Sequence, residues 1–107
     1  MIRGTTPTET LTVDKNISDH TIYVSYKSGG NIVTVTNDRM DIEYVPGADG
    51  QPESTIVTFT LTQKETLSLG VGTAEVQIRA IKNGTAVATS KKNVEVEPII
   101  LDGEINE

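Results

Sequence analysis

A strict alternation of apolar and polar residues in the second half of the chain constrains the fold more than any other feature of the sequence. Threonines alternate with apolar residues over residues 57–62, and a second alternating run covers residues 73–82. Successive side chains of a strand point to opposite faces, so this period places one face of each strand on a core. Asn83-Gly84 follows the second run and favours a two-residue hairpin turn, in which both central residues have a positive φ. The stretch therefore predicts antiparallel strands.

Shorter alternating segments precede this region, and turn residues separate them. The predicted strands cover residues 8–13, 20–27, 32–36, 40–44, 55–61, 73–82 and 87–96. The residues expected to face the core from the first five of these strands include Leu11, Val13, Ile22, Val24, Tyr26, Val33, Val35, Val57, Phe59 and Leu61. Many short strands separated by turn signals indicate an all-β fold, here an immunoglobulin-like antiparallel β-sandwich of seven to eight strands.

One short helix is predicted between two of these strands, near residues 63–69. Thr62 and Glu65 have the spacing of a capping box, in which the threonine caps the third amide and the glutamate reaches back to the amide of the cap. Glycines end the segment after one or two turns. We expect Leu67 or Leu69 to close one end of the core.

The composition narrows the class of protein. The 107 residues suit one domain, which we divide into an N-terminal arm (residues 1–7), a β-sandwich (residues 8–98) and an acidic C-terminal tail (residues 99–107). A net charge of −6 argues against binding to nucleic acid or to an anionic membrane. Cysteine is absent, which excludes disulfides and thiolate chemistry. The first residues lack an apolar signal-peptide core, so we expect a protein that is made in the cytoplasm and not secreted.

The C-terminal tail differs from the rest of the chain. Pro98 ends the preceding strand, and Ile99, Ile100 and Leu101 then form an apolar run without alternation. Acidic residues follow this run without any basic residue. Two interpretations remain open. The segment is either a frayed tail that folds back on the domain or an arm that buries its apolar run against a neighbouring subunit.

We expect no enzymatic activity, no cofactor and no metal site. The single histidine, His20, directly follows Ser18 and Asp19. Three consecutive side chains point to different sides of the backbone and therefore build no catalytic triad. Carboxylates gather around Asp41 and Glu43, but their spacing matches no standard calcium loop. Phosphate-binding glycine loops and zinc-protease motifs are absent as well. We therefore predict no catalytic, cofactor-binding or metal-binding residues.

Three stretches carry a resemblance to known proteins. They are the opening residues 1–8, the block at residues 57–66 and the alternating residues 72–80, of which the Arg-Gly-Thr-Thr-Pro-Thr start and the Leu-Thr-Gln-Lys-Glu-Thr block are distinctive. In these stretches the chain resembles small virion-associated proteins encoded among the tail genes of phages and prophages of Gram-positive bacteria. Its layout, including the Val-Glu-Val-Glu-Pro ending at residues 94–98, is also similar to the N-terminal domain of baseplate upper proteins.

The resemblance implies a structural protein of a virion, present in many copies around a symmetric particle. Baseplate upper proteins continue into a stalk or receptor-binding part, whereas this sequence ends at residue 107. We therefore expect a connector or adaptor of the tail or baseplate, with other phage structural proteins and copies of itself as partners. The residues expected to make subunit contacts are Arg3, Thr5, Pro7, Thr8, Ile99, Ile100 and Leu101.

Two other classes of protein stay open. A capsid-decoration or head-fibre protein shares this composition and differs only in its position on the particle. An immunoglobulin-like carbohydrate-binding or adhesion module requires outward aromatic side chains that stack on sugars. Tyr23 is the only tyrosine predicted to face outward, so a glycan contact would centre on it.

Overall fold

The computed structural model describes residues 1–107 and consists of eight strands, one short α-helix and one 3₁₀ turn. The elements are β1 (Thr8–Val13), β2 (Thr21–Ser28), β3 (Asn31–Thr36), η1 (Asn37–Arg39), β4 (Asp41–Val45), β5 (Ser54–Thr60), α1 (Gln63–Ser68), β6 (Gly72–Lys82), β7 (Thr85–Ala88) and β8 (Lys92–Val96). The predicted all-β fold is confirmed, and most predicted strands differ from the observed ones by one residue at one or both ends.

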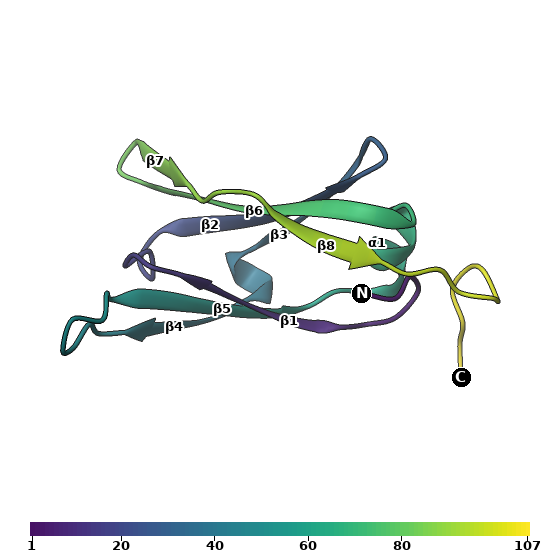
Figure 1. Cartoon of the computed structure of the whole chain (residues 1–107), viewed down its shortest axis with the longest axis horizontal. Helices are drawn as coiled ribbons and strands as arrows, with labels where there is room; N and C mark the ends of the chain where they lie inside the picture. Colours follow the sequence, from purple (N-terminus) through teal and green to yellow (C-terminus); the bar gives the residue numbers. More distant parts are fainter.

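The strands form two antiparallel sheets that pack face to face (Figure 1). One sheet has the order β1-β5-β4, and the other has the order β3-β2-β6, with β7 and β8 both paired to the remaining side of β6. If β1 is taken as strand B of an immunoglobulin sandwich, these orders correspond to B-E-D and C′-C-F-G. No strand pairs with the outer side of β1, where strand A would lie, and the N-terminal segment instead forms an isolated parallel bridge, Ile2 to Glu97, with the chain that follows β8.

The core lies between the sheets and is built from alternating strand residues. Sixteen buried apolar side chains form one cluster, and the residues predicted to face inward are all buried in it or packed against it. Within the cluster the rings of Tyr26 and Phe59 meet edge to face, with centroids 6.3 Å apart and planes at 69°. The expectation that Tyr23 is the only outward tyrosine is wrong. Tyr44 on the edge strand β4 is 39% exposed, and its hydroxyl donates to Glu53 at 3.4 Å.

The predicted helix forms, and α1 crosses one end of the sandwich. The amide of Glu65 donates to Thr62 Oγ1 at 3.1 Å, and the amide of Thr62 donates to Glu65 Oε1 at 2.9 Å, so the predicted capping box is present. Leu69 is fully buried and is the leucine that closes the core. Arg39 of η1 donates two bonds of 2.7 Å to the carboxylate of Glu65. This pair lowers the pKa of Glu65 and joins η1 to α1.

The C-terminal return strand is split into β7 and β8. The turn before it is the predicted hairpin, because Asn83 and Gly84 have φ values of 50° and 79°. Pairing with β6 then breaks at Thr89. Its amide donates to Ile78 O at 2.9 Å, but its hydroxyl, rather than a backbone carbonyl, accepts from the amide of Ile78 at 3.1 Å. The single strand predicted over residues 87–96 is therefore two strands.

The N-terminal segment is paired with the chain beyond β8. The ammonium group of Met1 donates to Glu95 O at 2.8 Å. The amide of Arg3 donates to Glu97 O at 3.1 Å, and the amide of Glu97 donates to Met1 O at 2.7 Å. These bonds fix the segment at the end of the sandwich from which the C-terminal tail leaves (Figure 1).

Candidate subunit interface

The outer edge of β1 carries no paired strand. The amide of Leu61 donates to Pro7 O at 3.0 Å, and this bond shows which residues of β1 direct their backbone groups toward β5. Bonded and non-bonded pairs alternate in an antiparallel ladder, so every second residue counted from Pro7 turns its backbone groups toward β5. The backbone N–H and C=O groups of the intervening Thr8, Thr10 and Thr12 therefore point away from the sheet. They form a free edge that another strand can pair with.

A groove with a volume of about 410 Å³ lies beside this edge, between β1 with its following turn and the break between β7 and β8. We call it the edge groove. Its apolar lining residues are Val13, Ile17, Ile78, Ala80, Val87 and Ala88, and its polar lining residues are Thr12, Asp14, Lys15, Thr89, Ser90 and Lys92. Most of the apolar lining belongs to the core cluster, so the opening reaches the apolar layer between the sheets.

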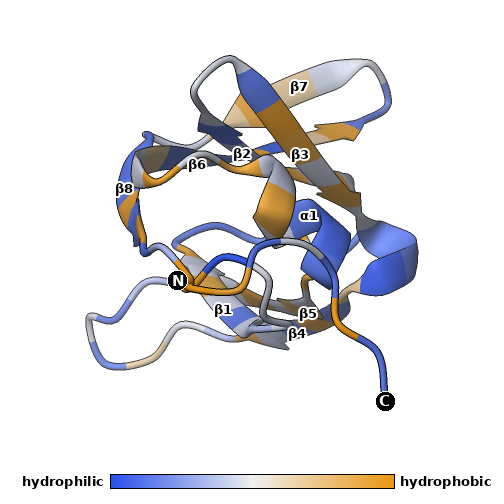
Figure 2. Ribbon diagram, turned by 90° about the vertical axis from the view of Figure 1, so that its right-hand side faces the viewer, coloured by the Kyte–Doolittle hydropathy of each residue, from blue (hydrophilic) through white to orange (hydrophobic).

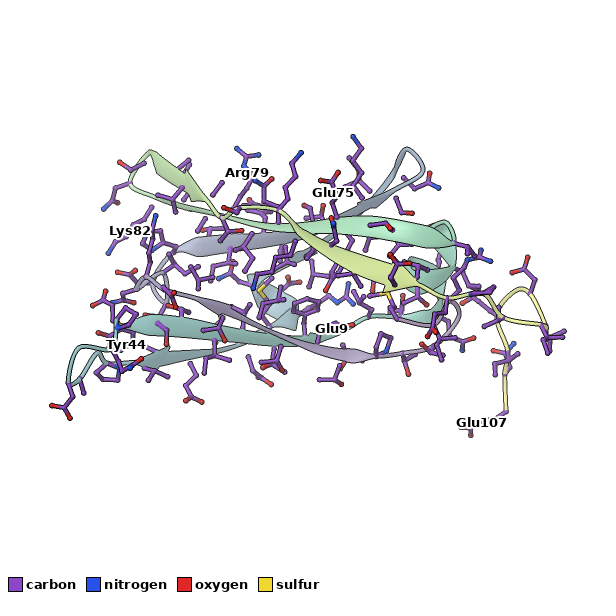
Figure 3. All side chains as sticks on the ribbon, viewed as in Figure 1. Glu9, Tyr44, Glu75, Arg79, Lys82 and Glu107 are labelled. Carbon is purple, nitrogen blue, oxygen red and sulfur yellow. The ribbon has the colours of Figure 1, made fainter.

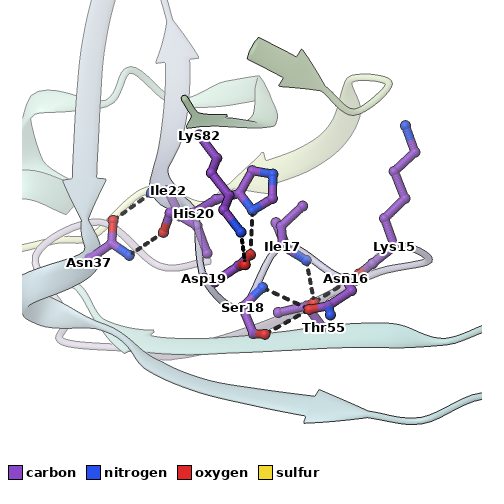
Figure 4. Close-up of polar contacts among 10 residues, drawn as sticks. All are labelled: Lys15, Asn16, Ile17, Ser18, Asp19, His20, Ile22, Asn37, Thr55 and Lys82. Atoms are coloured by element: carbon purple, nitrogen blue, oxygen red, sulfur yellow. Dashed lines mark hydrogen bonds and ion pairs between the residues drawn. The ribbon is translucent and has the colours of Figure 1, made fainter. Parts of the chain in front are cut away.

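The wall of the edge groove after β1 is held by one buried threonine (Figure 4). The hydroxyl of Thr55 donates to Lys15 O at 2.8 Å and accepts from the amide of Ile17 at 3.0 Å. Thr55 is fully buried in β5. The side chain of Thr55 thus fixes the first part of the turn that follows β1, where the two lining residues Lys15 and Ile17 lie.

Asn37 and Asp19 fix the remainder of this turn (Figure 4). The side-chain amide of Asn37 donates to His20 O at 3.0 Å and accepts from the amide of Ile22 at 2.5 Å. Asp19 accepts a hydrogen bond from Lys82 of β6, and its Oδ1 lies 2.8 Å from Nδ1 of His20. The bond from Lys82, followed by the contact with His20, lowers the pKa of Asp19 to about 2.

This lowered pKa predicts a pH dependence of stability. A carboxylate whose pKa lies below its ordinary value stabilises the fold at pH values above that ordinary value, and its contribution is lost as the pH falls through the pKa of the folded state. For Asp19 the ordinary value is 3.8 and the folded value about 2. We expect an NMR titration of the full chain to place this carboxyl near pH 2, and Lys82→Met to move it toward the ordinary value. An unchanged pKa in the variant would show that the lysine contact has no role.

The residues around His20 are not arranged as a nucleophile, a base and an orienting acid. The hydroxyl of Ser18 donates to Asn16 Oδ1 at 2.7 Å, whereas Asp19 is the residue in contact with the imidazole. No group of three or more histidine and carboxylate side chains is close enough to hold a metal ion. None of the helical segments has the length and apolar character that crossing a membrane needs.

The predicted contact residues of the N-terminal segment are engaged within the chain. Arg3 donates to two carbonyl oxygens at the C-terminal end of α1, at 2.8 and 3.0 Å. The carbonyl of Thr5 accepts from Thr66 at 2.9 Å, and the carbonyl of Pro7 bonds to the chain after β5. The hydroxyl of Thr8 lies 2.9 Å from a threonine hydroxyl of β5. The side chain of Arg3 and these carbonyls therefore join parts of one domain.

The three apolar contact residues of the C-terminal tail differ from one another. Ile99 is half-buried on its own domain, where a Cβ placed on Gly4 would lie 3.1 Å from its Cδ1. Ile100 is completely exposed, at 107%, and Leu101 is 71% exposed. Figure 2 looks at this end of the molecule and shows the tail running outside the sandwich. Ile99 therefore anchors the tail, while Ile100 and Leu101 are free to contact a neighbour.

Few polar contacts hold the rest of the tail. The side-chain amide of Gln63 donates to Ile105 O at 3.0 Å and accepts from the amide of Ile105 at 2.9 Å. Arg3 and Asp102 form an ion pair at 3.4 Å, in which the carboxylate side chain is 77% exposed. Surface contacts of this kind contribute little to stability.

The outer face of the five-stranded sheet has a second feature. A shallow hollow with a volume of about 230 Å³ is lined by Tyr23, Arg79, Ala80, Ile81 and Ala86. Tyr23 of β2 lies directly opposite Arg79 of β6 in the ladder and is 41% exposed. Figure 3 shows Arg79 and Glu75 pointing outward from this face.

No protein-family model matches the chain, and no curated protein matches its sequence. The edge groove was not expected from the sequence, since its lining comes from strands that are far apart along the chain. The one available signal was the lack of alternation in residues 1–7, which leaves β1 without an N-terminal partner strand.

Proposed function

We propose that the protein is a structural component of a phage virion, namely a connector or adaptor of the tail or baseplate that joins subunits in a symmetric assembly. The observation that carries the proposal is the exposure of Ile100 and Leu101 on a tail anchored to a well-packed sandwich. Burial of such side chains against a neighbour stabilises association in proportion to the apolar area removed from water. The resemblance of residues 3–8 and 61–66 to virion-associated proteins supports the same class of protein.

The sandwich suits this role because its interaction features lie apart from its core. The tail leaves from the end that carries α1, while β1 offers a free edge on the side of the edge groove. Copies of the chain and other virion proteins are the partners we propose. Repetition around a symmetric particle lets a modest interface per copy suffice, because contacts made by linked copies reinforce one another.

The test is electron microscopy of intact phage particles made with and without this chain. We expect density for the chain in the tail or baseplate, loss of that density when its gene is deleted, and recovery when the wild-type chain is supplied. Density on the capsid would instead assign it as a decoration or head-fibre protein. Purified particles that contain no copies would contradict a virion role.

A second candidate function, binding of a carbohydrate, is favoured by the hollow beside Tyr23. The exposed aromatic ring of Tyr23 and the guanidinium of Arg79 line the same hollow and offer one apolar and one hydrogen-bonding surface, and sugars present both kinds of group.

If this hollow binds a glycan, we expect Tyr23→Ala to weaken binding at least about tenfold on a glycan array. Tyr44→Ala is the matched control, because Tyr44 is exposed to a similar extent but lies on the other sheet. Equal losses in both variants, or no binding by the wild type, would remove this candidate.

A further inference from the structure

We infer that the edge groove receives residues 100–107 from a second copy of this chain, bound as an added strand along β1. The inference rests on the proposed function, because it names the contact through which copies are joined. The residue pattern of the tail, the free edge of β1 and the charges of the two surfaces each support it.

The tail has the residue pattern of a half-buried strand. From Leu101 onward every second residue, Gly103 and then Ile105, lies on one face of an extended chain, and Asp102, Glu104 and Asn106 lie on the other. Ile100 precedes this alternating part and lies on the same face as the polar side chains. The period of two thus places Leu101 and Ile105 together on the apolar face of the segment. On their own domain Leu101 and Ile105 are 71% and 60% exposed, so the apolar face has no cover.

The edge groove offers what such a strand requires. The outward backbone groups of Thr8, Thr10 and Thr12 provide donors and acceptors for a new ladder, as in strand addition to a free sheet edge. The side chains on one face of the added strand would then point toward the apolar lining of the groove. A smaller hollow lined by Leu11 and Val76 among others continues along the same edge, so the groove extends beyond its largest opening.

The charges of the two surfaces are complementary. Lys15 and Lys92 line the edge groove, and neither takes part in an ion pair within the chain. Asp14 is the single acidic lining residue. Residues 102–107 carry three carboxylate side chains and no basic group. The groove is therefore locally positive on a protein whose net charge is −6, and the segment inferred to enter it is acidic.

The positions of the two surfaces decide what kind of assembly results. The longest dimension of the molecule is 48 Å, and the tail leaves at one end of it while the turn after β1 and β7 lie toward the other (Figure 1). Such a contact joins two different surfaces and repeats from copy to copy, which generates a ring or a filament. To bind to a neighbour, the tail has to break only the exposed contacts that Asp102 and Ile105 make with their own domain.

The first test measures binding of a labelled synthetic peptide, residues 98–107, to the full chain by fluorescence anisotropy. Thr12→Pro removes an outward amide without breaking the ladder to β5, so we expect it to weaken binding at least about tenfold. Thr34→Pro is the matched control. Thr34 is also an exposed threonine on an edge strand, but its strand, β3, belongs to the other sheet and lies on the opposite side of the sandwich. We expect this variant to bind the peptide as the wild type does.

Binding that is equal in the wild type and Thr12→Pro, or absent in the wild type, would overturn the inference. If Thr12→Pro shifts the thermal unfolding transition, the double variant Lys15→Glu/Lys92→Glu decides instead. It keeps the backbone edge intact and reverses the charge of the groove, so we expect weaker binding at low salt, and unchanged binding would contradict the inference.

The second test mixes two full-length variants in sedimentation velocity. Leu101→Asp/Ile105→Asp retains the groove but lacks the apolar face of the tail, and Thr12→Pro retains the tail but lacks the edge. Each alone should remain monomeric, their mixture should give dimers and nothing larger, and the wild type should form longer assemblies. A wild type that stays monomeric at all concentrations, as it would if the tail entered its own groove, would overturn the inference. The position of the chain on phage particles would still be decided separately by microscopy.

Discussion

Replacing Phe59 with alanine is expected to lower the free energy of unfolding by about 3–5 kcal/mol. Phe59 is the only phenylalanine of the chain, is buried between the sheets and packs edge to face on Tyr26. Its removal leaves a cavity in a core that otherwise consists mainly of aliphatic side chains. Domains of this size have a total stability of about 5–15 kcal/mol, so the loss is a large fraction of it. Urea denaturation followed by circular dichroism measures the change.

Phe59→Leu is the matched control for this variant. It keeps an apolar side chain that fills much of the space, so we expect a loss of only about 1–2 kcal/mol. Equal losses in the two variants would show that the ring and its contact with Tyr26 add nothing beyond an apolar side chain at this position.

Replacing Thr55 with valine is expected to lower the free energy of unfolding by about 2–4 kcal/mol. Valine has nearly the same shape, so packing is preserved, but the hydroxyl that bonds both Lys15 O and the amide of Ile17 is lost. One buried donor and one acceptor are then left without a partner. We also expect the amide of Ile17 to exchange with solvent faster, because the turn that forms a wall of the edge groove loses its anchor.

Thr55→Ser separates the hydrogen bonds from the packing. Serine keeps the hydroxyl and loses one methyl group, for which we expect a loss of about 1 kcal/mol. Hydrogen exchange at Ile17 should stay slow in this variant and become fast only in Thr55→Val. Slow exchange in both would mean that backbone contacts alone hold the turn.

Most of the sandwich could be predicted from local patterns. Alternation alone placed Val57 and Phe59 on the core, and Asn83-Gly84 identified a turn because few other residues tolerate a positive φ at both positions. The capping box of Thr62 and Glu65 was also readable, since both of its bonds lie within one turn of helix.

Features that depend on contacts between distant segments could not be predicted. At the strand break, the side chain of Thr89 accepts the bond from the amide of Ile78 on a neighbouring strand, and this contact cannot be recognised from the local sequence. Tyr44 follows the alternation of its strand, yet the end of β4 lies at an edge that leaves the ring half-covered. Position in the sheet, rather than period, decides burial there.

The candidate interface was predictable only in part. The apolar run in the tail was visible as a break in alternation, but the sequence contained no sign that Ile99 packs on its own domain while Leu101 does not. The engagement of Arg3 with the carbonyls of α1 was equally hidden, because the two segments are far apart in the chain. The edge groove is open because no strand pairs with the outer side of β1, and local sequence patterns do not show which strands are neighbours in a sheet.

The lengthwise orientation of the strands affects how the domain would carry mechanical load. The long strands β5 and β6 run along the 48 Å axis, and their ladder bonds lie across it (Figure 1). A pull from one end of the domain to the other would therefore strain many of these bonds at once. A pull between the chain termini, which leave from the same end, would instead release the tail contacts of Ile105 and Asp102 and then open the bridge between Ile2 and Glu97. Force spectroscopy through the two pairs of attachment points should find markedly higher rupture forces for the lengthwise direction.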